Sequence, residues 1–202
     1  GLRPALIDLD PQGSSTRWLA NRPASLASII GTEGFQNSLQ VTKTWHLRTP
    51  ENSDLAVIDT PAGLTRQELI SATRGADAIL IPVMPSDIDI HAVMKCISDL
   101  LLVAKIPRPD MKIGIIANRV RANTRVYGQL KKFLSSLDIP VVATLRDSQN
   151  YTRAFEFGMG IHEMPFSQVK KDIDAWSAIM GWLNRLRERN LGQPSAIHYL
   201  RG

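Results

Sequence analysis

Two short apolar segments, about fifty residues apart, each end in carboxylates. The first is Ala5-Leu-Ile-Asp-Leu-Asp-Pro-Gln-Gly, and the second is Asp54-Leu-Ala-Val-Ile-Asp-Thr-Pro-Ala-Gly. Apolar runs of this length are typical of strands that are buried on both faces of a parallel sheet. Open α/β sheets bind ligands at the carboxyl ends of their parallel strands. We therefore expect Asp8, Asp10 and Asp59 at a ligand-binding edge.

These carboxylates favour a site for magnesium and a nucleotide, because hard oxygen ligands suit Mg²⁺ and its water shell. A second interpretation is open for Asp8, since a strand that ends in an Asx-type turn needs the same residue. The usual phosphate-binding motif, G-x-x-x-x-G-K-[ST], does not occur in the 202 residues. The chemistry of a magnesium–nucleotide site is therefore half present.

Short apolar runs alternate with helical patterns along the chain, which predicts βαβ units and a doubly wound, mostly parallel sheet between two layers of helices. The predicted strands are Ala5–Leu9, Leu39–Thr42, Leu55–Asp59, Ala78–Pro82, Lys112–Ala117 and Val141–Thr144. A helix is expected to start in the serines after Gly13, and further helices are predicted over residues 65–74, 89–104, 124–136 and 172–190. Gly75 fits the position after a helix end, and Asn123 fits an N-cap.

Composition narrows the possible partners and chemistries. The chain has 44% apolar and 21% charged residues, which is ordinary for a globular fold. Its net charge of +5 favours polyanionic partners such as nucleic acid, with a solvated basic surface as the alternative. Cys96 is the single cysteine, so an internal disulfide and a cysteine-ligated iron–sulfur cluster are excluded. No apolar run approaches the ~20 residues that span a bilayer.

Longer segments resemble the ParA/MinD family of partitioning ATPases. LIDLDPQGSST is similar to the segment that follows the family's first strand and helix, and AVIDTPAG is similar to its Walker B strand. AILIPVMPSDIDIHAV and RDSQNYTRAFEFGMGIHEM resemble later parts of ParA proteins. The resemblance implies a P-loop NTPase-like fold over residues 1–190, without the first strand, phosphate loop and first helix, which would lie upstream of Gly1. Residues 191–202 are expected to be a flexible tail.

The resemblance also assigns roles at the strand ends. It implies that Asp59 holds the hydration shell of Mg²⁺ and that Asp10 orients or activates the attacking water. Asp8 either supports Mg²⁺ or braces the loop. Thr60 and Gly63 would belong to the switch loop that senses the γ-phosphate, although Gly63 could be a simple turn former.

Three later residues are candidates for nucleotide recognition. Asn118 is expected to end a strand, where its amide can pair with the purine edge of ATP or can serve in a turn. Arg146 and Asp147 lie in the Thr144–Asp147 loop that should flank the purine. Arg146 could stack, contact phosphate, or be an ordinary exposed arginine.

Nonspecific DNA binding in this family uses basic residues on the dimer surface. By position the candidates are Arg121 and Arg125, which follow Asn118, and Lys170 and Lys171, which precede the predicted last helix. Contacts from Lys and Arg to phosphate are independent of sequence and sensitive to salt. Each of these residues could instead be ordinary surface.

The predicted function is an ATP-dependent dimerisation and DNA-binding switch that positions a plasmid, a chromosome or another cargo. Homodimerisation with ATP and Mg²⁺, a ParB-like stimulating partner, and a cytoplasmic, nucleoid-associated location are expected. Two alternatives are a non-catalytic interaction module and a MinD-like membrane-cycling regulator. The second is disfavoured because residues 191–202 lack a sustained apolar face, so no stable membrane anchor is expected.

The 202 residues alone are predicted to be inactive, because a phosphate loop supplies the backbone N–H groups and the lysine that hold the phosphates. In the resembled fold, the strand before this loop lies between Leu55–Asp59 and Ala78–Pro82. Without it the chain should be molten or aggregated, or should rearrange so that these two strands pair directly.

Overall fold

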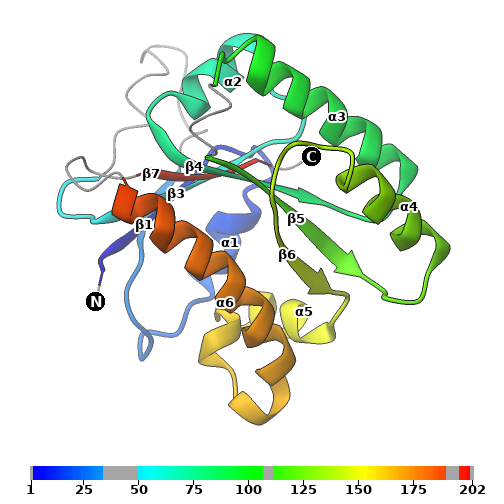
Figure 1. Ribbon diagram of the computed structural model, residues 1–202. Coiled ribbons are helices and arrows are strands. Elements are labelled where there is room, and N and C mark those ends of the chain that lie inside the picture. The colour runs from blue at the N-terminus through cyan, green and yellow to red at the C-terminus, as the bar shows by residue number, and fades with distance from the viewer. Residues whose placement is uncertain (1, 34–49, 107–111, 190–195, 201–202) are drawn as a thin grey trace.

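The computed structural model describes residues 2–33, 50–106, 112–189 and 196–200 (Figure 1). In this part of the chain, seven parallel strands form one sheet in the order β2-β1-β3-β7-β4-β5-β6. The strands are β1 (Pro4–Asp8), β2 (Ile30–Glu33), β3 (Leu55–Thr60), β4 (Ala76–Val83), β5 (Ile113–Val120), β6 (Val141–Arg146) and β7 (Ala196–Leu200). The helices are α1 (Ser14–Ala20), α2 (Arg66–Thr73), α3 (Asp87–Leu102), α4 (Arg125–Leu134), α5 (Gln149–Glu156) and α6 (Phe166–Arg189), with a 3₁₀ turn, η3 (Ile161–Glu163).

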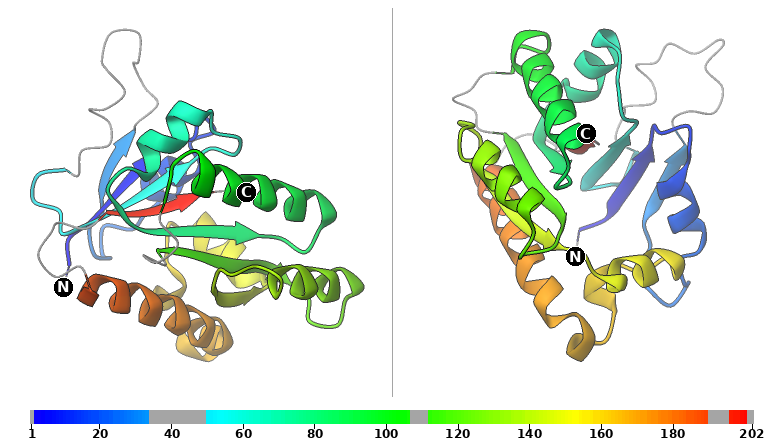
Figure 2. Two further views of the ribbon diagram at one scale, coloured as in Figure 1. Left: turned by 45° about the horizontal axis from the view of Figure 1, so that its top comes forward. Right: turned by 90° about the vertical axis from the view of Figure 1, so that its right-hand side faces the viewer.

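Helices cover both faces of the sheet (Figures 1 and 2). Side chains of α2, α3 and α4 pack with Ile79, Ile81 and Ile115 on one face. On the opposite face, α6 places Ile179, Trp182, Leu183 and Leu186 against Ala78, Leu80 and Ile116. The doubly wound, parallel α/β fold that the sequence predicted is confirmed.

The apolar runs define the strands well, and the observed bounds extend most of them by one to three residues. The predicted strand Leu39–Thr42 lies outside the described residues. Strand β2 and helix α5 were not predicted. Helix α6 begins at Phe166 instead of residue 172, because Pro165 precedes its first turn and Val169 already packs in the interior.

Local capping fixes the helix ends next to the sheet. Thr65 and Glu68 form a reciprocal capping box at the start of α2, and Gly75 follows its C-cap with φ of 76°. The predicted N-cap Asn123 is wrong by one residue. The hydroxyl of Thr124 accepts the hydrogen bond from the Tyr127 N–H, and α4 starts there.

Strand β7 lies in the middle of the sheet, between β3 and β4, and runs parallel to both (Figure 2). The expectation of a flexible tail over residues 191–202 is therefore wrong for these five residues. Direct pairing of β3 with β4 is also not what the structure has. One physical reason explains both outcomes. Each of the buried strands β3 and β4 has a row of backbone groups that needs hydrogen-bond partners, and an extended segment between the strands pairs with both rows.

Candidate functional site: the carboxyl ends of β1 and β3

Asp8 and Asp59 are direct register partners on the neighbouring strands β1 and β3. Their exposed fractions are 1% and 6%, and Asp10, just after β1, is 5% exposed. A parallel sheet places register partners on the same face, and here that face carries α1. The sequence prediction that these carboxylates meet at one edge holds for Asp8 and Asp59.

Both oxygens of Asp8 accept hydrogen bonds from the protein. Oδ1 accepts the backbone N–H of Asp10 at 3.0 Å, and Oδ2 accepts the backbone N–H and the hydroxyl of Thr16 at 2.8 and 3.0 Å. Thr16 is the third residue of α1, whose N-cap is Gly13 and has no side-chain cap bond. Asp8 thus caps α1 from a neighbouring strand. These hydrogen bonds brace the first turn of α1.

Asp59 and Asp10 have different surroundings. Asp59 Oδ2 accepts the hydroxyl of Ser15 at 2.6 Å, so β3 and α1 are tied at the site. Asp10 Oδ1 accepts the backbone N–H of Gln12 at 2.9 Å, and its carbonyl accepts the N–H of Gly13. Gly13 turns the chain with φ of 62°, a conformation that glycine adopts without a Cβ penalty. Ser15 and Thr16 are therefore site residues that the sequence analysis did not name.

The predicted switch-loop residues follow β3. Thr60 ends the strand and is fully buried. Gly63 has φ of 73°, and a Cβ at this position would meet no neighbouring atom. Glycine is therefore favoured here by the backbone conformation and not by lack of space. Both residues lie on the chain segment that leaves the carboxylates and enters α2 at Arg66.

The donor set suits a hydrated hard cation. The Asp59 carboxylate and the Ser15 hydroxyl are oxygen ligands of the kind that Mg²⁺ takes, one or two at a time, while it keeps several waters. In the described part of the chain, no group of three or more His, Cys, Asp or Glu side chains could hold a metal ion. A cavity of about 270 Å³ opens beside Asp8, between α1 and the strands β1 and β2.

The residues predicted for base recognition lie apart from the carboxylates, around β5 and β6. Asn118 does not end its strand, because β5 continues through an irregularity to Val120. Its Oδ1 accepts the backbone N–H of Arg119, which has φ of 49°. Arg146, at the end of β6, donates two hydrogen bonds, at 2.7 and 2.8 Å, to the fully buried carboxylate of Asp172 on α6.

Asp172 and Asp147 are both held as carboxylates. Burial raises the pKa of Asp172, but hydrogen bonds from Arg146 and Asn150 outweigh this and leave the pKa below its ordinary value. A hydrogen bond from Arg121, at 2.8 Å, likewise lowers the pKa of Asp147. Arg146 thus fixes the start of α6 to β6, and the sequence did not signal this partner.

The residues predicted to contact DNA are exposed on two separate elements. Arg121 and Arg125 lie at the connection between β5 and α4, and the side chain of Arg121 is 77% exposed although it pairs with Asp147. Lys170 and Lys171 lie near the start of α6. Their exposure is compatible with phosphate contacts and with an ordinary basic surface.

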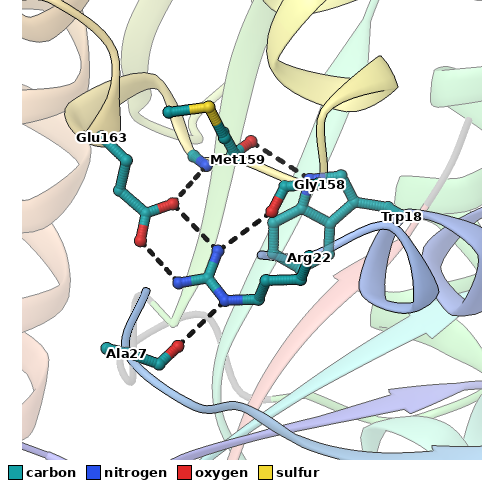
Figure 3. A network of polar contacts seen from close by, with 7 residues as sticks. Trp18, Arg22, Ala27, Gly158, Met159 and Glu163 are labelled. Carbon is teal, nitrogen blue, oxygen red and sulfur yellow. Dashed lines mark hydrogen bonds and ion pairs between the residues drawn. The ribbon is translucent and has the colours of Figure 1, made fainter. Parts of the chain in front are cut away.

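The far end of α1 is held by a polar network (Figure 3). Trp18 donates its indole N–H to the carbonyl of Met159 at 3.1 Å. Arg22, whose side chain is 8% exposed, makes a bidentate ion pair with Glu163 and also donates to the carbonyls of Ala27 and Gly158. Helix α1 is thus tied to the carboxylates at one end and to η3 at the other.

No family model matches the chain. The Maintenance of carboxysome distribution protein A of Halothiobacillus neapolitanus is 26% identical over 165 residues, which cover 80% of this chain and 74% of that protein. Its namesake from Gloeobacter kilaueensis is 28% identical over 95 residues, 47% of this chain and 42% of that protein.

Solved structures show the same fold. A putative plasmid partition protein from Borrelia burgdorferi, bound to AMPPNP, has a TM-score of 0.64 and 14% identity, with 90% of this chain and 87% of that chain covered. The MinD cell division protein of Aquifex aeolicus has a TM-score of 0.60 and 16% identity, with 90% and 85% covered.

The fold is thus that of the ParA/MinD proteins. The sequence similarity is to two proteins named for the maintenance of carboxysome distribution. The resemblance to the ParA/MinD family that the motifs indicated is confirmed.

Proposed function

We propose that this chain is part of a ParA-like ATPase that positions an intracellular cargo through ATP-dependent dimerisation and nonspecific binding of DNA. The observation that carries the proposal is the register pairing of Asp8 with Asp59, braced by Thr16 and Ser15 of one short helix. The similarity to carboxysome distribution proteins favours a large assembly as the cargo. A cytoplasmic, nucleoid-associated location follows from such a role.

Each carboxylate has a separate task in this proposal. Asp59 holds Mg²⁺ through its hydration shell together with the Ser15 hydroxyl, and Asp10 orients the attacking water. Asp8 keeps α1 in place. When bound, Mg²⁺ supplies neutralisation of the phosphate charge. Thr60 and Gly63 respond to the γ-phosphate. Asn118, Arg146 and Asp147 help to form the part of the site that faces the base. Arg146 does so indirectly, through its hydrogen bonds to Asp172 on α6.

The test compares single substitutions in a chain to which a phosphate-loop segment has been joined before Gly1. Asp10→Ala should leave ATP binding and dimerisation largely intact and remove hydrolysis, whereas Asp59→Ala should weaken the binding of Mg-ATP itself. Asp99→Ala is a matched control, because Asp99 forms only a surface pair with Lys95 on α3. Titrations with nucleotide and measurements of ATP turnover distinguish the two variants. If Asp10→Ala lost ATP binding while Asp59→Ala bound ATP normally, the roles assigned to Asp10 and Asp59 would have to be exchanged.

The 202 residues alone should not release phosphate from Mg-ATP. They contain no phosphate-loop sequence, and carboxylates repel the phosphates that this loop would bind. Steady-state phosphate release should equal that of the Asp10→Ala, Asp59→Ala double variant. A rate clearly above this control would contradict the assignment. Failure of the phosphate-loop protein to bind ATP would instead favour a non-catalytic interaction module.

DNA binding should require the ATP-bound dimer and should show no sequence preference. Arg121→Glu with Lys170→Glu should weaken binding and flatten its dependence on salt, because fewer phosphate charges are neutralised. Arg74→Glu with Lys95→Glu is the control, because it reverses two other exposed charges, one just after α2 and one on α3. Gel shifts on two unrelated duplexes over a salt series measure both pairs. If the test and control double variants bound DNA equally well, the DNA-binding surface would not include Arg121 and Lys170.

A ParB-like partner that stimulates hydrolysis completes the proposed cycle. A complex of MinC with MinD from Aquifex aeolicus is among the similar structures, with a TM-score of 0.58 and 15% identity, and that MinD therefore has a protein partner. Within the described ranges, no helix is both long and apolar enough to cross a membrane.

A further inference from the structure

Helix α4 presents a short basic ridge to solvent at the rim of the molecule (Figure 1). Leu130 and Leu134 anchor the helix in the core. The opposite face carries Arg125, Gly128 and Lys132, all of them exposed. Residues spaced i, i+3 and i+7 lie along one face of a helix, and the two cations are two turns apart, about 10 Å along the axis. We name these three residues the α4 ridge.

The fold itself does not require glycine at position 128. Gly128 is exposed, its φ is not positive, and a Cβ there would meet no atom within 4 Å. Glycine inside a helix costs about 1 kcal/mol relative to alanine, because it loses more backbone freedom on folding. The chain thus keeps a glycine that weakens its own helix. The remaining use of such a glycine is to let another molecule approach the helix backbone closely.

The side chains around Gly128 indicate which kind of molecule this is. Arg125 and Lys132 are cationic, Gln129 beside them is an exposed amide, and α4 contains no acidic residue. Lysine and arginine neutralise the phosphates of nucleic acids, and amide side chains donate hydrogen bonds to the same oxygens. The composition of this face therefore fits a phosphate backbone.

An acidic protein fits the α4 ridge less well. Protein interfaces centre on apolar or aromatic anchors, and the ridge has none. Val126 is 44% exposed, but it lies about 100° around the helix from Arg125. Tyr127 is half-buried, and the ammonium of Lys131 lies over its ring, 5.0 Å from the centroid. The apolar side chains of α4 are thus not part of the ridge.

We propose that the α4 ridge is a contact surface for the phosphate backbone of duplex DNA. The backbone lies over Gly128, where no Cβ holds it away, and Arg125 and Lys132 pair with phosphates on either side. The contact is independent of base sequence, because only the backbone is touched. This proposal rests on the proposed function and deepens it, since it assigns the DNA contact to one helix face and adds Gly128 and Lys132 to the candidate Arg125.

The test titrates the full chain, isotope-labelled for NMR, with a short duplex of mixed sequence at low salt, where weak nonspecific binding is strongest. Amide shifts should change most along the outer face of α4, and fluorescence anisotropy gives the affinity. Arg125→Glu with Lys132→Glu should weaken binding at least ~10-fold and lower its slope against log salt by about 2, since each phosphate contact contributes about 0.9. Arg74→Glu with Lys95→Glu makes the same change of charge away from α4 and should leave the shifts on α4 in place.

Gly128→Ala separates the α4 ridge from a surface that is merely basic. Alanine is the better helix former, so this variant should have a higher melting temperature. It should nevertheless bind the duplex at least ~3-fold more weakly, because the added Cβ holds the phosphate backbone away from the helix. Gly128→Leu should weaken binding further. Neither variant changes the charge, so a surface that acts through net charge alone would bind equally well in both.

The proposal is overturned if the two double variants bind the duplex alike, if both Gly128 variants bind it as tightly as the unmodified chain, or if the unmodified chain does not bind it. Equal binding of polyglutamate with matched charge would assign the ridge to an acidic polypeptide and would also overturn it. The proposed function is judged separately, by gel shifts of the ATP-bound dimer. If that dimer binds DNA and changes in the α4 ridge have no effect, only the role of the ridge is refuted.

Discussion

Arg22 offers the sharpest quantitative test of the structure, because its side chain joins the segment just after α1 to η3. Its guanidinium makes two hydrogen bonds to Glu163 and two to backbone carbonyls, while 8% of the side chain is exposed. Removing one partner of a buried ion pair typically costs about 3–5 kcal/mol. Glu163 is 26% exposed and keeps the N–H of Gly160, so water recovers part of that loss. We expect Arg22→Ala to lower the free energy of unfolding by about 2–4 kcal/mol.

Urea unfolding followed by circular dichroism measures this loss as a shift in the midpoint at constant slope. Arg3→Ala is the matched control, since Arg3 also makes two side-chain bonds to a carboxylate, that of Asp54, but at an exposed site. Its loss should be much smaller, as for surface ion pairs in general. If Arg22→Ala costs no more than Arg3→Ala, the network does not carry the stability assigned to it.

The effect of Arg22→Ala should also depend on pH. The hydrogen bond from Arg22 lowers the pKa of Glu163 in the folded protein. A lowered folded pKa gives stability that is fully present above the unfolded pKa of about 4.3 and is lost as the pH falls through the folded pKa. The cost of Arg22→Ala should therefore shrink below about pH 4. A cost that is unchanged down to the acid transition would contradict an ionised pair.

Three further substitutions test separate features. Gly158→Ala should destabilise the fold by at least ~2 kcal/mol, because Gly158 has φ of 60° and a Cβ there would lie 2.4 Å from the backbone of the α1–β2 connection. The control Gly128→Ala, at a helix position with open space around it, should stabilise the fold slightly. Thermal melts of both variants measure the difference. Asp172→Asn should cost about 1–3 kcal/mol at pH 7. The cost should shrink as the pH falls toward the folded pKa of Asp172, which is lowered. Urea midpoints at pH 7 and pH 3 measure it, and a cost independent of pH would refute the pairing with Arg146. Thr65→Ala should cost about 1 kcal/mol through loss of the capping box, seen as a lower melting temperature, and no change would mean that the box is not formed.

Local pattern predicted the strands well but not the centre of the sheet. The runs that became β1, β3, β4 and β5 are continuous in apolar residues, and such runs specify a buried strand without outside help. The segment Ala196–Leu200 contains His198 and follows Gly192 and Pro194, so it was interpreted as a tail. It is a strand because β3 and β4 present unpaired backbone groups on both sides. Because β3 and β4 are distant from this segment in the sequence, their pairing with it cannot be predicted from a local pattern.

The candidate site also has features that the sequence predicted and features that only the structure shows. The location of Asp8 and Asp59 at the ends of buried parallel strands was predicted, but their pairing in register comes from the structure. The role of Asp8 was not predictable, because it depends on hydrogen bonds with the N–H and hydroxyl of Thr16. Arg146 was interpreted as a possible nucleotide contact, and no periodicity signals its pairing with Asp172. Polar side chains can pair with many partners of similar chemistry, so only the fold selects among them.

Helix α1 connects these observations physically. It has seven residues, no buried side chain and no side-chain cap from its own N-cap. An isolated helix of that length is unstable in water. It forms here because Asp8 and Asp59 hold its first turn and the Trp18 and Arg22 contacts hold its far end. Neither set of contacts alone fixes both ends of the helix. The contacts of α1 and of the residues just after it thus join the carboxylate site to the segment between α5 and α6.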